Sequence, residues 1–220
     1  RPDQARGGGA VMRRTTSLQW DREPDAWYVE PSWPSERLFA VERFEGRVVD
    51  PCCGMGTIPN AARAAGLQAE GYDLRDRGFP GVTGGKDFFS TDWLHGTWPC
   101  ENIVSNPPYA TWGQLGRVRP TRDARNRAEE EFLRVSLTRA RRKVALFLPS
   151  GWINGEARGA WLESLPLYRV YLIGPRPSCP PGPFLRDGGK AGNGTGDYSW
   201  FVFLIGFQGA PTVHWLRRAA

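Results

Sequence analysis

The sequence lacks the features that mark membrane and secreted proteins. Its 220 residues contain no apolar run near the roughly 20 residues that a membrane-spanning helix needs, and no signal-like apolar segment near the first residue. The four cysteines have neither CxxC nor Cys/His spacing, which argues against a zinc site and against a disulfide framework. We therefore expect a cytoplasmic protein with reduced thiols, no membrane partner and no bound metal.

Lysine is also scarce, since only Lys86, Lys143 and Lys190 represent it among 29 basic residues. The others are arginine, and the formal net charge is +6. An arginine bias can reflect a GC-rich genome, but the guanidinium group also suits contacts with phosphates and bases. The charge favours a nucleic-acid partner without establishing one.

Length and composition predict one folded domain. A chain of this length with 40% hydrophobic residues can bury a full core. Residues 1–17 are basic, contain three consecutive glycines and lack a hydrophobic period, so we expect a flexible tail there. The single domain would then span residues 18–220, without internal repeats.

Periodicity and turn residues predict the elements of an α/β fold. The expected strands cover residues 47–50, 69–72, 102–105, 144–148, 170–173, 199–207 and 212–216. The expected helices cover residues 35–46, with Ser35 as the N-cap and Gly46 at the end, and residues 58–65, 125–142 and 156–165. Residues 174–197 form the longest irregular stretch, and long loops in compact domains are usually functional or mobile.

The most informative stretch follows the buried strand 102–105. The prolines of Asn106-Pro107-Pro108-Tyr109 prevent the strand from continuing and form a turn at its carboxyl end, where open α/β sheets bind ligands. The Asn106 oxygen and the Pro107 carbonyl can each accept one hydrogen of a planar amine, while Tyr109 can stack on the ring that carries it. An ordinary Asn-Pro loop would also explain the pattern.

A second motif lies upstream, where the short strand ending in Asp50 leads into the turn 51–56 and a helix of small residues. Glycines in such a turn let the backbone approach a ligand closely. The turn departs from the dinucleotide fingerprint and lacks the Lys-Ser/Thr of a phosphate-binding loop. Asp50 would repel a pyrophosphate and attract an ammonium or sulfonium group.

Further acids follow the next strands of the expected sheet. Asp73 comes 23 residues after Asp50, close to the spacing of a carboxylate that binds ribose hydroxyls. Asp87 can accept a hydrogen bond from an adenine amine while Phe88 packs on the ring. Each acid alone could be a simple turn residue, but the series with Asn106 predicts a cofactor of the adenosine type.

Together the motifs Asp-Pro-x-x-Gly-x-Gly, Tyr-Asp-Leu, Asp-Phe-Phe and Asn-Pro-Pro-Tyr resemble those of S-adenosylmethionine-dependent amino-methyltransferases. The resemblance is greatest to DNA adenine-N6 methyltransferases of the small phage and prophage type, and it covers about residues 25–216. Cytosine-N4 enzymes of this group usually carry serine where Asn106 stands, which favours adenine. The resemblance implies residence in a bacterial or phage-infected host cytoplasm.

This resemblance also implies a fold and a cofactor. The fold would be a Rossmann-like class I methyltransferase fold, with a mostly parallel seven-stranded sheet, an antiparallel last strand in a final hairpin, and helices on both faces. The cofactor would be S-adenosylmethionine, released as S-adenosylhomocysteine, with no metal. The segment 25–31 resembles the piece that closes the methionine end of the cofactor site.

The expected site residues fall into three groups. The catalytic residues would be Asn106, Pro107, Pro108 and Tyr109. The cofactor residues would be Tyr28, Val29, Glu30, Pro31, Asp50, Pro51, Cys52, Gly54, Gly56, Asp73, Leu74, Asp87 and Phe88. The nucleic-acid contacts would be Trp112, Arg117, Arg119, Arg122 and Phe184.

We expect DNA as the partner and adenine N6 as the methylated atom. Since no separate target-recognition domain is recognisable in the sequence, we expect a short or relaxed recognition site. The alternative is an RNA adenine or guanine amino-methyltransferase. A non-catalytic nucleic-acid-binding module is a further alternative, which the intact cofactor series argues against. The sequence does not indicate the oligomeric state.

Overall fold

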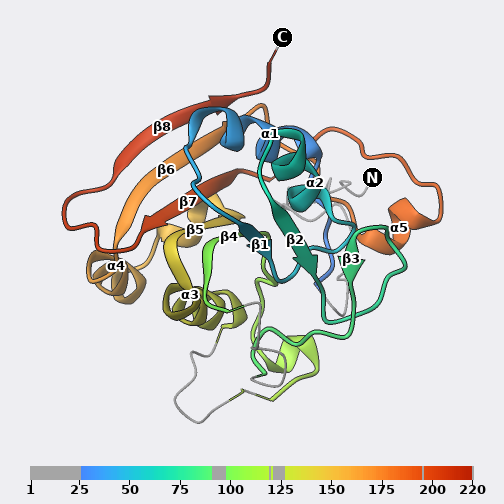
Figure 1. Cartoon of the computed structure of the whole chain (residues 1–220), viewed down its shortest axis with the longest axis horizontal. Helices are drawn as coiled ribbons and strands as arrows, with labels where there is room; N and C mark the ends of the chain where they lie inside the picture. Colours follow the sequence, from blue (N-terminus) through green and yellow to red (C-terminus); the bar gives the residue numbers. More distant parts are fainter. Residues whose placement is uncertain (1–25, 91–97, 119, 121–126, 195, 220) are drawn as a thin grey trace, which may run out of the picture.

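The computed structural model describes residues 26–90, 98–118, 120, 127–194 and 196–219 (Figure 1). The expected tail 1–17, Arg119 and Arg122 lie outside these residues. The strands are β1 (Val48–Asp50), β2 (Ala69–Tyr72), β3 (Val82–Thr83), β4 (Cys100–Ser105), β5 (Ala140–Pro149), β6 (Leu167–Gly174), β7 (Tyr198–Leu204) and β8 (Thr212–Arg217). The helices are α1 (Ser32–Val41), α2 (Thr57–Ala64), α3 (Ala128–Arg139), α4 (Glu156–Glu163) and α5 (Gly182–Arg186), with 3₁₀ turns η1 (Gly113–Leu115) and η2 (Ser150–Ile153).

In the described part of the chain, eight strands form one sheet in the order β3-β2-β1-β4-β5-β7-β6-β8. The five neighbouring strands β3, β2, β1, β4 and β5 are parallel to one another. Strand β7 is antiparallel to both β5 and β6, and β8 is parallel to β6. The expected α/β class with a mostly parallel sheet is confirmed.

Two details of the expected sheet are wrong. Within the described residues the sheet has eight strands rather than seven, because β3 forms inside the expected loop 81–85 and extends one edge. The antiparallel strand is β7, not the last strand, and β7 and β8 form no hairpin because β6 lies between them. The run Trp200–Phe203 is buried on both faces, as a central strand requires, whereas β8 is largely exposed at the edge.

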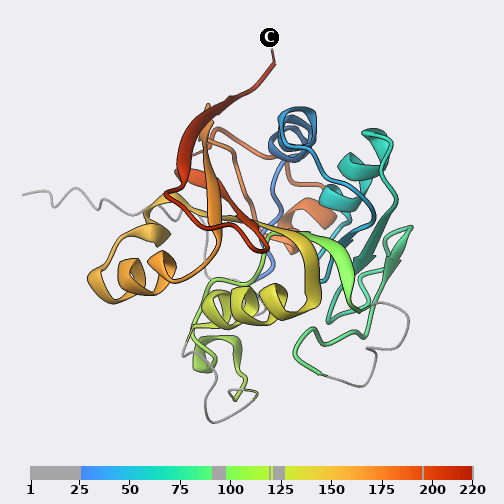
Figure 2. The same ribbon diagram turned by 60° about the vertical axis from the view of Figure 1, so that its left-hand side comes forward.

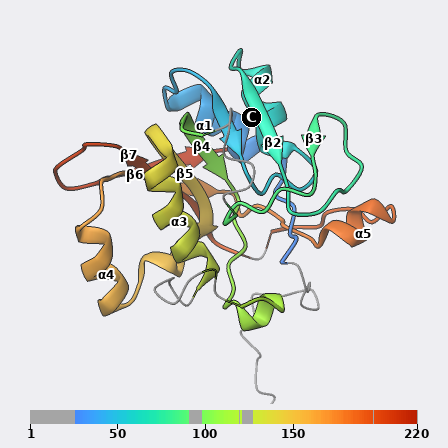
Figure 3. The same cartoon turned by 60° about the horizontal axis from the view of Figure 1, so that its bottom comes forward.

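Helices cover both faces of the sheet, with α1 and α2 on one side and α3 and α4 on the other (Figures 2 and 3). Because neighbouring strand residues point to opposite faces, Val48 packs under α1 and α2 while Val49 packs under α3. In β5, Phe147 packs in the same layer as Val48, and Leu146 packs in the same layer as Val49. Two apolar layers therefore hold the strand ends in place.

The first helix starts earlier than expected. It begins at Ser32, directly after Pro31, and Ser35 is buried inside it rather than capping it. Pro34 is tolerated because the first helical turn has no partners for its N–H groups. The helix ends at Val41, and Gly46 lies beyond it in a turn with φ of +85° that leads to β1.

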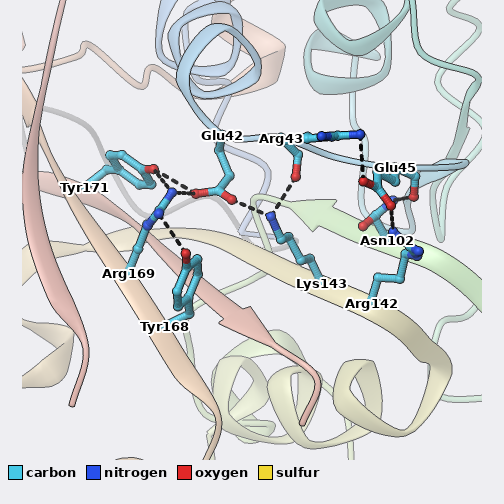
Figure 4. A network of polar contacts seen from close by, with 9 residues as sticks. All are labelled: Glu42, Arg43, Glu45, Asn102, Arg142, Lys143, Tyr168, Arg169 and Tyr171. Carbon is cyan, nitrogen blue, oxygen red and sulfur yellow. Dashed lines mark hydrogen bonds and ion pairs between the residues drawn. The ribbon is translucent and has the colours of Figure 1, made fainter. Parts of the chain in front are cut away.

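A buried ionic network joins the end of α1 to the sheet (Figure 4). Glu42 is only 3% exposed and accepts hydrogen bonds from Tyr171 at 2.7 Å, from Arg169 at 3.0 Å and from Lys143. Burial alone would raise the pKa of Glu42, but Lys143, Tyr171 and Arg169 hold the pKa below its ordinary value. The network connects α1 to β5 and β6.

The chain order creates a crevice at the centre of the sheet. After β1 the chain builds outward to β2 and β3, then returns to place β4 on the other side of β1. At such a reversal the loops after β1 and β4 diverge and leave a site at the carboxyl ends of the strands. No helix among the described residues is long and apolar enough to cross a membrane.

Candidate active site

A cavity with about 810 Å³ of empty space, part of it open to solvent, lies at the carboxyl ends of β1 to β4. The expected cofactor residues that line it are Tyr28, Val29, Glu30, Pro51, Cys52, Gly54, Asp73, Leu74, Asp87 and Phe88. The expected catalytic residues that line it are Asn106 and Pro108. Pro31, Asp50, Gly56, Pro107 and Tyr109 are not among its lining residues. The structure thus brings most of the expected site into one cavity.

The glycine turn after β1 is held against two neighbouring segments. The Gly54 N–H donates to the Asp73 carboxylate at 2.9 Å, and Gly54 has a φ of +53°. A Cβ at this position would come within 2.9 Å of the Trp27 indole nitrogen. That nitrogen is buried and has no hydrogen-bond partner among the described residues. The turn therefore requires glycine both for its backbone angle and for its contact with Trp27.

Asp50 lies beneath this turn and is 1% exposed. One carboxylate oxygen accepts hydrogen bonds from the Ser105 hydroxyl at 2.7 Å and the Cys52 N–H at 3.1 Å, which ties β4 to the turn. The other oxygen is buried without a partner among the described residues. Burial raises the pKa of Asp50 well above its ordinary value, and the nearby Glu30 and Asp73 carboxylates add to the shift.

Asp73 lines the cavity and is 6% exposed. Besides the Gly54 N–H, it accepts hydrogen bonds from the Arg75 N–H at 2.9 Å and from the Arg77 side chain at 3.3 Å. The Arg77 guanidinium also lies 3.9 Å from the centre of the Trp27 ring. The acid expected to bind ribose hydroxyls is therefore already oriented by the turns on either side of it.

Asp87 also lines the cavity. One of its oxygens accepts the Phe89 N–H at 3.0 Å, and the other forms an ion pair with Arg117. Phe88 is 2% exposed, and its ring packs against Phe132 with ring centres 4.4 Å apart. Phe88 therefore belongs to the core and also lines the cavity.

The Asn106 side chain is held by three polar groups. Its amide nitrogen donates to the Glu30 carboxylate at 2.7 Å and to the Tyr28 carbonyl at 3.2 Å, and its oxygen accepts the Tyr109 hydroxyl at 2.8 Å. Burial raises the pKa of Glu30 to about 7, although the hydrogen bond from Asn106 opposes the shift. The Tyr109 ring is partly buried against the core, and its hydroxyl is directed to Asn106, while its expected stacking on a substrate ring stays a prediction.

The segment that carries Glu30 is fixed by the long loop 174–197. The Val29 N–H donates to the Pro180 carbonyl and the Gly182 N–H donates to the Trp27 carbonyl, both at 2.9 Å. A Cβ on Gly182 would overlap the Trp27 ring at 2.1 Å, so the close approach of the two segments depends on this glycine. Part of the irregular loop, which contains α5, thus packs behind the segment that lines the cavity.

The residues expected to contact nucleic acid differ in burial and in their position relative to the cavity. Trp112 is 3% exposed and packs edge-on against Phe89, which is a correction because a buried ring offers no face to a base. Phe184 is half-buried in α5 and does not line the cavity. Arg117 lines the cavity, while Arg119 and Arg122 lie outside the described residues.

Several lining residues were not predicted from the sequence. They are Ala26, Trp27, Cys53, Met55, Thr57, Arg75, Arg77, Lys86 and Leu115. Trp27 belongs to the segment 25–31, whose resemblance to a cofactor-closing segment could have indicated it. Arg77 follows Asp73 by four residues in a loop without periodicity, so no sequence pattern indicates that it turns back toward Trp27.

Comparisons with known proteins bear on the fold. No family model and no curated protein matches the sequence. Among solved structures, a type I restriction-modification protein aligns over 91% of this chain and 46% of its own, with a TM-score of 0.56 and 16% identity. A Listeria monocytogenes protein assigned to the class I S-adenosylmethionine-dependent methyltransferases aligns over 86% of this chain and 63% of its own, with a TM-score of 0.53 and 11% identity. The chain has the class I methyltransferase fold.

A third similar structure is the methyltransferase subunit of a type I restriction-modification system from Streptococcus thermophilus. It aligns over 85% of this chain and 45% of its own, with a TM-score of 0.52 and 16% identity. The chain spans less than two thirds of the length of each of these structures. At such identities the similarity establishes the fold alone.

Proposed function

We propose that the protein transfers a methyl group from S-adenosylmethionine to the exocyclic N6 of an adenine in DNA. One observation carries the proposal: Asn106 lines the same cavity as the glycine turn and the acids Asp73 and Asp87. An amide that can accept the hydrogens of an amine therefore lies beside groups suited to an adenosine-type cofactor.

The residues present fit this cofactor. Burial raises the pKa of Asp50, and Glu30 and Asp73 lie close enough to Asp50 to raise it further, so a cationic group near the three carboxylates would relieve their repulsion. A sulfonium or ammonium group meets that need. Asp73 would hold the ribose hydroxyls, and Asp87 the adenine amine, with Leu74 as an apolar contact that is 37% exposed. When bound, S-adenosylmethionine supplies an electrophilic methyl group.

The chain's own residues would prepare the substrate amine. An adenine amine is a poor nucleophile because its lone pair is delocalised into the ring. The Asn106 oxygen would accept one of its hydrogens, and the carbonyl of Pro107, which lies between the two lining residues Asn106 and Pro108, would accept the other. Together these acceptors would favour a pyramidal nitrogen with a localised lone pair. Since no charge has to be created before attack, most of the acceleration would come from positioning.

A base inside a duplex cannot reach such a cavity. The adenine would have to leave the base stack at a cost of about a few kcal/mol, and contacts within the site would offset that cost. The net charge of +6 and the position of Arg117 at the cavity favour a nucleic-acid substrate. Restriction-modification proteins among the structural relatives favour DNA over RNA.

Nucleoside mass spectrometry tests the proposal directly. Unmethylated duplex DNA and total RNA would each be incubated with the protein and S-adenosylmethionine, then digested. We expect N6-methyladenine in the DNA digest, and methylation in RNA alone would instead establish the RNA amino-methyltransferase. The Asn106→Ala variant should lose activity, whereas Asn154→Ala, which removes an exposed asparagine outside the cavity, should retain it. Full methylation by Asn106→Ala would overturn the role of Asn106.

A further inference from the structure

The contacts of Asn106 determine which end of its amide faces a substrate. Both amide hydrogens are used, one by the Glu30 carboxylate at 2.7 Å and one by the Tyr28 carbonyl at 3.2 Å. The amide oxygen has two lone pairs, and the Tyr109 hydroxyl occupies one of them at 2.8 Å. The second lone pair remains for one hydrogen of a substrate amine, so Tyr109 does not have to leave.

Orientation matters here because the two ends of an asparagine amide have almost the same shape. A rotated amide would present N–H groups to the substrate, and these cannot accept the hydrogens of an amine. The Tyr109 hydroxyl can donate or accept, so it does not distinguish the two orientations. The ionised Glu30 carboxylate and the Tyr28 carbonyl can only accept, so both favour the orientation with the nitrogen toward them. The bond to Glu30 is the shorter one and involves a charged acceptor, so Glu30 contributes the larger share of this preference.

We propose that Glu30 is a positioning residue for methyl transfer, which holds the Asn106 amide with its oxygen available to the substrate amine. This inference rests on the proposed function and departs from the expected role of Glu30 as a cofactor contact only. Glu30 is 6% exposed and lies 76 residues before Asn106 in the chain, so the contact is formed by the fold and shielded from water.

Burial raises the pKa of Glu30 to about 7, so its ionisation changes near neutral pH. The titratable groups that interact with it are Asp50 at the end of β1, Cys53 in the glycine turn, Tyr109 after β4 and Cys179 before α5. Burial raises the pKa of the phenol and of both thiols, so these groups stay neutral near pH 7. A protonated Glu30 carries an O–H donor and can pair with a rotated Asn106. Activity should therefore rise as Glu30 loses its proton.

Kinetics of Glu30→Ala and Glu30→Gln separate positioning from cofactor binding. Glu30→Ala should lower kcat by roughly 100-fold while the Kd for S-adenosylmethionine stays within about 3-fold, because misplacement of a reacting group acts on the chemical step. Glu30→Gln keeps an acceptor oxygen and should lose less. In kcat/KM, the wild type should show a rise centred near pH 7 that Glu30→Gln lacks. The matched control is Glu36→Gln, which removes an exposed carboxylate of α1.

Two kinetic outcomes would overturn the inference. One is a loss that appears only in the Kd for S-adenosylmethionine with kcat unchanged, which would make Glu30 a cofactor contact. The other is a pH profile of Glu30→Gln identical to that of the wild type. If Glu30→Ala does not fold, Glu30→Gln and its pH profile still decide the question.

A second readout does not depend on activity. The side-chain amide resonance of Asn106, assigned by its loss in Asn106→Asp, should shift with pH near 7 in the wild type and stay constant in Glu30→Gln. A resonance that does not respond to pH overturns the inference. A resonance that titrates in a protein without methyl transfer would support the contact while showing that the proposed function has failed.

Discussion

The guanidinium group of Arg117 forms an ion pair with the carboxylate of Asp87, which precedes it by 30 residues in the chain. Both residues line the cavity, and each side chain is 31% exposed. The Asp87 oxygen that would accept a cofactor amine is therefore shared with a cation. Arg117 follows the Asn106 turn, so one ion pair connects the expected cofactor side of the cavity with the expected substrate side.

Replacement of Arg117 by alanine should strengthen cofactor binding. The partly exposed pair is worth about 1 kcal/mol, so its removal should lower the Kd for S-adenosylmethionine by roughly two- to five-fold in calorimetry. Arg142→Ala is a suitable control because Arg142 pairs with Glu45 and does not line the cavity. Weaker binding by Arg117→Ala would mean that Arg117 itself contacts the cofactor.

Gly54→Ala and Gly66→Ala form a matched pair of substitutions. Both glycines have positive φ, +53° and +82°, so alanine at either position should destabilise the protein by about 1–2 kcal/mol. A Cβ at Gly54 would meet the Trp27 nitrogen at 2.9 Å, whereas a Cβ at Gly66 would meet nothing within 4 Å. We expect weaker cofactor binding only in Gly54→Ala. Equal binding by both variants would show that the turn does not contact the cofactor.

Glu30→Gln should change how stability depends on pH. In the folded protein burial raises the pKa of Glu30 from 4.5 to about 7, so the folded state binds more protons between these values. The free energy of unfolding of the wild type should thus fall as pH rises through this window. Ionisation of the buried Glu30 should account for a loss on the order of 3 kcal/mol. Glutamine cannot ionise, so the variant should gain stability relative to the wild type between pH 5 and pH 8 in urea unfolding. Parallel stability curves would contradict the assignment.

Loss of Glu42 should destabilise the fold strongly. Glu42→Ala leaves Lys143 and Arg169 without their buried carboxylate and should cost about 3–5 kcal/mol in urea unfolding near pH 7. Because the folded pKa of Glu42 is lowered, its contribution is present above the unfolded value of 4.5 and is lost as pH falls below it. Glu45→Ala, which removes an exposed carboxylate nearby, should change stability little. Similar losses in both variants would argue against a special role for the buried network.

Local features of the sequence determined the elements that position the site. The acids Asp50, Asp73 and Asp87 and the amide of Asn106 were predicted together because each of them ends, follows or nearly follows an expected strand or turn of the sheet. Prolines and glycines act on their own backbone and their immediate neighbours, so the turns at Pro107 and Gly54 could be predicted without knowledge of distant residues. The parallel order of these strands then brings their carboxyl ends to one edge.

Contacts between distant segments were decided only by the tertiary structure. The placement of β7 between β5 and β6, the burial of Trp112 and the pairing of Glu30 with Asn106 depend on which surfaces meet after the sheet has formed. Sequence patterns report the period of an element and the face that it buries, but not its neighbour. Side-chain partners are selected later, by packing and by the cost of leaving buried polar groups unpaired, and this is why the orientation of Asn106 could not be predicted from the sequence.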